Sequence, residues 1–273
     1  MIRRRLAPLR LSSLGLSLLR QVLRHAFSLK RACASLAVTL VLAGCAGEQD
    51  IYPTPDDFQV HGIDVSKYQG DIDWGAVRSS GVQFAWIKAT EGGDYLDEKF
   101  SRNWELAKEA GVPRGAYHFM YWCRPAEQQA EWFVEHVPKD PDALPPVLDV
   151  EWNNVSRTCP THVSREAAIA SMKTVLHAME TAYGKRPVIY TSIDFYHDVI
   201  EGSLGDYPMW LRSVKYYPAV KYGGQHWHFW QHSEHAHVPG INGNVDENAF
   251  YGTPSDWHQF LALANSDAPP EPH

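Results

Sequence analysis

The sequence predicts an α/β fold, an irregular TIM-like β/α barrel of about eight strands. Apolar strand-like segments alternate with helical segments through much of the chain, which is typical of βαβ units and a parallel sheet. The strand-like segments between residues 60 and 250 are numerous enough to close a barrel. The last three follow one another with little room for helices. The expected order is therefore five βα units followed by three strands.

Each element is justified by residue type and by the residues that bound it. The expected strands are 60–65, 84–89, 114–121, 146–151, 187–191, 208–212, 227–231 and 245–250. The expected helices are 74–79, 100–110, 125–136 and 164–183. Asp73 caps the first helix, and Gly111 ends the second. Pro125 occupies the first turn of the third, and Ser164 caps the fourth.

The first 44 residues differ in composition from the rest of the chain. They hold eight Arg or Lys and no acid, whereas the whole chain of 273 residues has a net charge of −7. Residues 45–273 therefore carry −15, which disfavours nucleic-acid binding because phosphates would be repelled. The hydrophobic fraction of 44% is ample for a core, and no apolar run approaches the ~18 residues of a membrane span.

A secretory pattern lies at the end of this first segment. Lys30 and Arg31 precede the apolar stretch 32–44, which ends in Leu-Ala-Gly before Cys45. This ending resembles a bacterial lipoprotein signal, which implies cleavage before Cys45 and a lipid anchor on its sulfur. A short buried helix is the alternative. Residues 1–29 also suit an organelle transit peptide or a start codon assigned too far upstream, and the sequence leaves these open.

The chain is accordingly divided into four segments. These are a signal peptide (1–44), a polar Pro-bearing tether (45–58), a barrel domain (59–262) and a flexible tail (263–273). The protein is expected to be exported, anchored to a bacterial membrane facing the periplasm or the cell surface, and monomeric. Two cysteines remain in the exported domain, Cys123 and Cys159. They follow neighbouring strands, so we expect one disulfide between them.

Acidic residues fall at the ends of several expected strands. In a β/α barrel the site lies at the carboxyl ends of the strands, so these side chains should converge. Asp149 and Glu151 are two residues apart at the end of an apolar strand and should point to the same face. Two close carboxyl groups perturb each other's pKa, so that one tends to hold a proton while the other stays ionised. A glycosidase requires such a pair. Asp64, Glu91 and Asp246 should join this rim, although a lone Asp-x-Glu on a surface strand would be unremarkable.

The body resembles glycoside hydrolase family 25, the muramidase-type lysozymes. The matching blocks are HGIDVSKYQG (61–70), FAWIKATEG (84–92), GAYHF (115–119), LDVE (148–151), PVIYT (187–191), WL (210–211), WQ (230–231) and VD (245–246). The resemblance implies hydrolysis of the β-1,4 bond between N-acetylmuramic acid and N-acetylglucosamine in peptidoglycan, without a metal or other cofactor.

The resemblance also implies residue roles. Glu151 would be the general acid, and Asp149 would orient the substrate acetamide, whose oxygen could attack the anomeric carbon. Asp64 and Asp246 match further acids of the family site, and Tyr117 matches an aromatic residue beside the reacting sugar.

Four further residues of the matched blocks are candidates for substrate binding: Glu91, Lys88, Trp210 and Trp230. Aromatic faces suit sugar rings, although most tryptophans of a barrel belong to its core. The sequence departs from the family pattern at Arg212, where a small residue is usual, at His232 and at Glu247. These departures bear on specificity or pH optimum.

Two other functions remain in competition. The first is a non-catalytic peptidoglycan-binding lipoprotein on the same barrel, since a fold alone does not prove chemistry. The second is a metal-dependent deacetylase or amidase built on a histidine cluster, whose members are His226, His228, His232, His235 and His237. A solvent-exposed loop with adventitious metal affinity is the simpler interpretation of this cluster.

Overall fold

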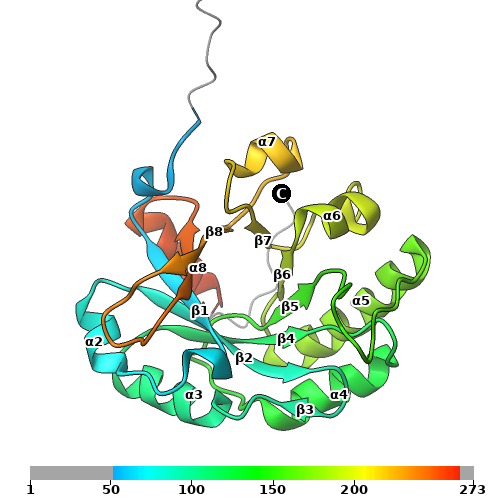
Figure 1. The fold of residues 1–273 in the computed structure, drawn as a ribbon, viewed down its shortest axis with the longest axis horizontal. Coiled ribbons are helices and arrows are strands. Elements are labelled where there is room, and N and C mark those ends of the chain that lie inside the picture. The colour runs from blue at the N-terminus through cyan, green and yellow to red at the C-terminus, as the bar shows by residue number, and fades with distance from the viewer. Residues whose placement is uncertain (1–51, 265–273) are drawn as a thin grey trace, which may run out of the picture. The chain divides into compact units, whose positions relative to one another are not determined.

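The computed structural model describes residues 52–264 as a β/α barrel (Figure 1). The predicted signal peptide, Cys45 and residues 265–273 of the predicted tail lie outside the described residues. The strands are β1 (His61–Val65), β2 (Phe84–Glu91), β3 (Tyr95–Leu96), β4 (Arg114–Phe119), β5 (Val147–Val150), β6 (Val188–Thr191), β7 (Met209–Arg212), β8 (Phe229–Ala236) and β9 (Val245–Phe250).

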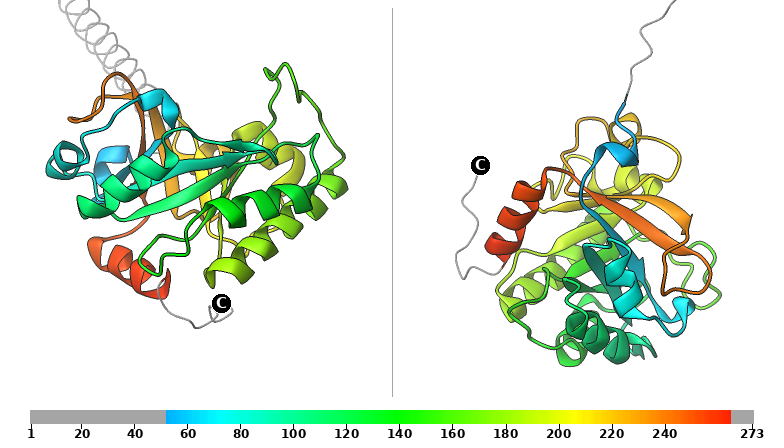
Figure 2. Two further views of the ribbon diagram at one scale, coloured as in Figure 1. Left: turned by 90° about the horizontal axis from the view of Figure 1, so that it is seen from below. Right: turned by 90° about the vertical axis from the view of Figure 1, so that its left-hand side faces the viewer.

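The helices lie outside the strands (Figure 2). They are α2 (Trp74–Ser79), α3 (Phe100–Glu109), α4 (Ala126–His136), α5 (Arg165–Tyr183), α6 (Ile193–Phe195), α7 (Pro218–Tyr222) and α8 (Pro254–Ala264). Shorter turns are η1 (Pro55–Asp57), η2 (Lys67–Gln69) and the π-helical η3 (Tyr196–Ile200). Among residues 52–264, no helix combines the length and apolarity needed to cross a bilayer.

The sheet closes on itself. Its strand order is β1-β9-β8-β7-β6-β5-β4-β2-β3, and β1 also pairs with β2, which leaves the short β3 outside the closed ring of eight. The predicted irregular barrel is thereby confirmed. Within the closed ring one strand differs from the expected parallel sheet, because β9 runs antiparallel to both β8 and β1. The beginning of β9, rather than its end, therefore lies at the same rim as the carboxyl ends of the other strands.

Helix starts follow the predicted capping chemistry. Asp73 Oδ1 accepts a hydrogen bond from the Ala76 amide at 3.0 Å, and Ser164 caps α5 in the same way. The structure adds α8, which sequence analysis missed and which continues two residues into the expected tail. Thr253 and Asp256 bond each other's backbone amides at its start, a capping-box pattern that the sequence did contain.

The barrel interior is layered and closed at one end. Aromatic and aliphatic residues at the amino ends of the parallel strands, including Phe84 and Phe229, form a buried cluster with Phe250 from the end of β9. Trp257 of α8 packs on this cluster, 5.2 Å between ring centroids from both Phe84 and Phe250. Trp86 and Trp210 stack above it at 5.7 Å. This cluster fills one end of the barrel, and the cavity lined by polar side chains lies at the opposite end.

Candidate active site

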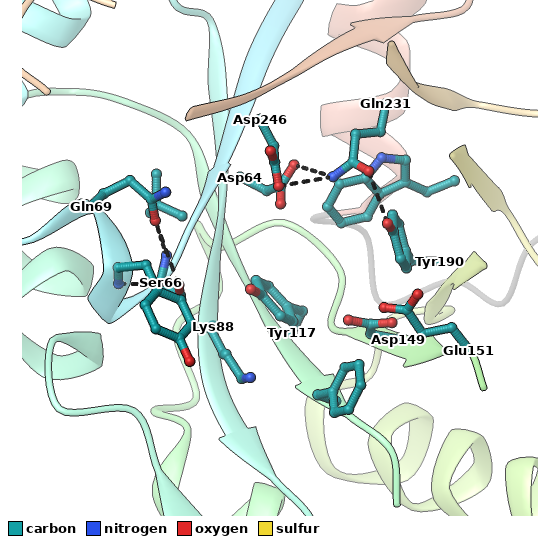
Figure 3. A pocket seen from close by; sticks show the side chains of 14 residues that line it. Asp64, Ser66, Gln69, Lys88, Tyr117, Asp149, Glu151, Tyr190, Gln231 and Asp246 are labelled. Carbon is teal, nitrogen blue, oxygen red and sulfur yellow. Dashed lines mark hydrogen bonds between the residues drawn. The ribbon is translucent and has the colours of Figure 1, made fainter. Parts of the chain in front are cut away.

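A cavity of about 250 Å³ opens at the carboxyl ends of the parallel strands (Figure 3). Seven of the residues expected at the site line it: Asp64, Lys88, Tyr117, Asp149, Glu151, Trp210 and Asp246. They come from β1, β2, β4, β5, β7 and β9, with Glu151 directly after β5. The structure therefore brings four of the five acids predicted for this rim together around one space, and Glu91 is the one that does not line it.

Asp149 and Glu151 share one wall of the cavity. Asp149 is 7% exposed, and its Oδ1 atom is buried with no hydrogen-bond partner among residues 52–264. Burial raises the pKa of Asp149 well above its ordinary value, and the neighbouring Glu151 raises it further. Burial also raises the pKa of Glu151, an effect that the positive charge of Arg212 partly opposes. The pair is therefore suited to hold a proton at neutral pH.

Asp64 and Asp246 form the second acidic pair. They are directly opposite in the β1–β9 ladder. Gln231 Nε2 donates to Asp64 Oδ2 at 2.9 Å and lies 3.4 Å from Asp246 Oδ2. Burial raises the pKa of Asp246 to about 8, and the Asp64 carboxylate contributes to this shift. Burial likewise raises the pKa of Asp64, although hydrogen bonds from Asn248 and Gln231 oppose the change.

Two hydrogen-bonded chains hold Asp64 in place, and sequence analysis assigned neither. Tyr190 Oη donates to Gln231 Oε1 at 2.8 Å, which turns the Gln231 amide nitrogen toward Asp64. Trp210 Nε1 donates to Asn248 Oδ1 at 2.7 Å, and Asn248 Nδ2 donates to Asp64 Oδ2 at 2.8 Å. Three of these donors lie within matched blocks and Asn248 follows the last block by two residues, but only the barrel register shows that they meet.

Tyr117 and Lys88 line the cavity from adjacent strands. The phenol of Tyr117 is surrounded by acids, and burial raises its pKa well above the ordinary value, so it stays neutral. Lys88 Nζ lies 2.5 Å from Glu91 Oε2. Burial alone would raise the pKa of Glu91, but Lys88 lowers it overall. Glu91 also accepts a hydrogen bond from Tyr121 Oη. Glu91 does not line the cavity, so it can influence the site only by pairing with Lys88, which does.

The two tryptophans expected to bind substrate differ in position. Trp210 lines the cavity and is 2% exposed, so little of its ring is available. Trp230, in contrast, does not line the cavity. Its indole nitrogen donates to the Ser213 carbonyl at 2.9 Å, and its ring packs against Phe58 and Tyr217. The alternation of side chains along β8 places Gln231 inside and its neighbour Trp230 outside the barrel.

Cys123 and Cys159 are joined by a disulfide, with Cα atoms 5.7 Å apart. The bond links the loop after β4 to the loop after Glu151. Trp122, next to Cys123, donates its indole N–H to the Glu151 carbonyl at 2.9 Å. The backbone that carries Glu151 is thus fixed from two directions.

The histidine cluster is spread along β8 and its flanks. His226 and His228 have ring centroids 5.0 Å apart, and His232 contacts the ring of His61 at 6.0 Å. Within the part of the chain that the structure describes, no three His, Cys, Asp or Glu side chains are grouped so that they could hold a metal ion. The cluster also lies apart from the cavity lining.

Comparison with known proteins decides the family. The profile of the glycosyl hydrolases family 25 matches residues 63–241. The chain belongs to glycosyl hydrolase family 25. It is 40% identical over 212 residues, 76% of this chain and 75% of the relative, to the uncharacterized protein YegX of Escherichia coli O157:H7. It is 36% identical over 236 residues, 81% of this chain and 76% of the relative, to lysozyme M1 of Streptomyces globisporus.

Solved structures of family 25 hydrolases share the barrel. The structure of a family 25 glycosyl hydrolase from Bacillus anthracis superposes with a TM-score of 0.70 at 32% identity, covering 78% of this chain and 99% of that one. In the chain described here, the cavity presents Glu151, whose raised pKa favours a bound proton, beside a second buried carboxyl group, that of Asp149. That is the chemical requirement for cleaving a glycosidic bond.

Proposed function

We propose that this chain is a lysozyme, an N-acetylmuramidase that hydrolyses the β-1,4 bonds between N-acetylmuramic acid and N-acetylglucosamine in peptidoglycan. The observation that carries the proposal is the Asp149–Glu151 pair, buried in the cavity of a family 25 barrel. Similarity to lysozyme M1 supports the choice of substrate. The result is breakdown of cell wall polymer.

In the proposed mechanism Glu151 is the general acid. Its raised pKa keeps the proton that it delivers to the glycosidic oxygen as the bond to the anomeric carbon breaks. The acetamide oxygen of the N-acetylmuramic acid whose anomeric carbon is reacting attacks that carbon in place of a protein nucleophile. Asp149 Oδ1, which is buried and unpaired, is suited to accept the acetamide N–H. Water then opens the cyclic intermediate, and Glu151 recovers its proton from it.

The other acids and Tyr117 stabilise this arrangement. As positive charge develops at the anomeric carbon, the Asp64–Asp246 pair provides a negative field from the facing strands. Tyr117 is a neutral hydrogen-bond donor among these acids and is proposed to lie beside the reacting sugar. Lys88 and Trp210 are proposed to contact the glycan from the adjoining walls.

The test uses the purified chain and insoluble peptidoglycan. Release of reducing ends that carry muramic acid is expected from the wild type, and Glu151→Gln is expected to reduce it by about 10²–10⁴-fold. Glu135→Gln is the matched control, because Glu135 lies on α4 away from the cavity. Unchanged turnover in Glu151→Gln would refute the assignment of the acid. Binding of peptidoglycan by the wild type without any product would instead support the non-catalytic lipoprotein.

We further propose that residues 1–44 direct export and that Cys45 carries a lipid anchor, with 45–58 as the tether to a monomeric barrel. The Leu-Ala-Gly-Cys ending supports this, as does a disulfide in the body, because such bonds persist outside the cytosol. Labelled palmitate should be incorporated into the wild type in a bacterial host and not into Cys45→Ala. The barrel domain can be released from its anchor by proteolysis and studied without detergent. Its molar mass by light scattering should be that of one chain, and the mass of a dimer would refute the monomer.

A further inference from the structure

A stretch without acids interrupts this acidic protein. Residues 45–273 have a net charge of −15, yet residues 207–233 contain no Asp or Glu. Within that stretch Lys215 and Lys221 flank exposed apolar side chains, Val214 (41% exposed), Tyr216 (40%) and Val220 (44%). We call these five residues the Lys–Tyr surface.

The ammonium groups of both lysines of the Lys–Tyr surface lie near the ring of Tyr216. Lys221 Nζ lies 4.3 Å and Lys215 Nζ 5.6 Å from the centroid of Tyr216. Neither forms an ion pair within residues 52–264. Arg212, in contrast, is paired with Glu234. The lysines are therefore the cations of this segment that remain available to an anionic ligand.

The Lys–Tyr surface is fixed at the rim of the active site. It follows β7, whose residue Trp210 lines the cavity, and includes part of α7 (Figure 1). Tyr222 Oη lies 2.7 Å from the Arg212 carbonyl oxygen at the end of β7 and 3.3 Å from the Thr191 carbonyl oxygen at the end of β6. Ser213 Oγ donates to the Tyr216 carbonyl at 2.6 Å. The segment is therefore attached to the carboxyl ends of two barrel strands.

We propose that the Lys–Tyr surface binds the carboxylates of the peptide stems attached to muramic acid, so that the enzyme prefers glycan strands that carry peptides. This inference rests on the proposed function and names a substrate class for the same site. The sugar backbone is uncharged where its muramic acid is linked to peptide, whereas the stems carry free carboxylates and alanine methyl groups. Lysine ammonium groups suit the former, and the exposed Tyr and Val side chains suit the latter.

The experiment compares two substrates: soluble glycan strands with intact stems and the same strands after amidase treatment. The amidase removes the stems and leaves one free lactyl carboxylate on each muramic acid, so both substrates are anionic and only the first carries the carboxylates and methyl groups of the stems. The Lys215→Ala/Lys221→Ala variant should lose about three- to tenfold in kcat/KM on peptide-bearing strands and keep wild-type kcat/KM on bare strands. The wild-type preference should decline as salt is raised. The matched control is Lys139→Ala/Lys173→Ala, which removes two exposed lysines elsewhere on the barrel and should change neither value.

The outcomes separate this inference from the proposed function. A wild type that cleaves neither substrate refutes both. A wild type that cleaves both substrates equally well, or a variant that loses activity equally on both, overturns the peptide contact alone. Sedimentation with vesicles containing anionic lipid tests a membrane role. Vesicle binding that disappears in the variant while both substrates are cleaved as by the wild type would also overturn the inference.

Discussion

Asp64 on β1 and Asp246 on β9 face each other across an antiparallel ladder, and the side-chain amide of Gln231 reaches both carboxyl groups. Two carboxylates this close cannot both ionise without cost, so they titrate as a unit. The raised pKa of Asp246, about 8, follows from its burial and from the charge of Asp64. The pair thus links stability to pH.

Asp246→Asn should make the protein more stable at neutral and mildly alkaline pH. An aspartate with a raised folded-state pKa binds more protons folded than unfolded, so its contribution to stability declines as pH rises from the unfolded value of 3.8 to about 8. Asparagine removes that penalty. Thermal unfolding at several pH values should show a gain that grows over this window and levels off above pH 8. A gain independent of pH would contradict the titration.

Arg212 and Glu234 should move the pH profile of activity in opposite directions. Arg212 lowers the pKa of Glu151 and Glu234 raises it, while burial is the largest influence. The general acid must be protonated, so kcat/KM falls as pH rises through its pKa. Arg212→Gln should shift this alkaline limb to higher pH, and Glu234→Gln should shift it to lower pH. Movement of both variants in one direction would show that the ion pair acts through structure instead.

The loop that follows Glu151 should depend on its disulfide. Removing the Cys123–Cys159 bond with Cys123→Ser/Cys159→Ser should lower the free energy of unfolding by about 2–4 kcal/mol, because the bond restricts the unfolded chain. Dithiothreitol should lower the Tm of the wild type and leave the double variant unchanged. If both forms respond alike, the reductant acts elsewhere.

Trp122→Phe tests the second restraint on Glu151. The substitution keeps an aromatic ring but removes the N–H that donates to the Glu151 carbonyl at 2.9 Å. The expected cost is about 1 kcal/mol of stability. A lower kcat with an unchanged KM is expected as well, since Glu151 is less well oriented. A rise in KM alone would indicate that Trp122 affects substrate binding.

The close approach of β4 to Trp86 should make Gly115 intolerant of substitution. A Cβ atom at Gly115 would lie 2.0 Å from Trp86 Cζ3, within the stack that supports the site. Gly115→Ala should therefore destabilise the protein by about 1–3 kcal/mol or more in denaturant titrations. Gly224→Ala is the control, because a Cβ there meets nothing within 4 Å. Equal stability of the two variants would contradict the packing.

Local pattern was sufficient to predict most of the barrel. The apolar runs that precede Asp149 and Asp64 predicted their strands, since a buried strand is recognised by its own residues. Capping residues such as Asp73 located helix starts within about one residue. The acids of the site were found because they interrupt or end these runs. Helix α8 was missed although its capping box is visible in the sequence.

The sequence alone determined which segments form the eight strands of the closed ring and which carboxyl groups lie on them. Only the tertiary structure decided that β9 is antiparallel, which brings Asp246 to the rim from the beginning of its strand. It also decided that Gln231 faces the acids while Trp230 faces outward. Strand direction and the inner face depend on hydrogen bonds to strands far away in the chain. Residue spacing within one strand does not contain that information.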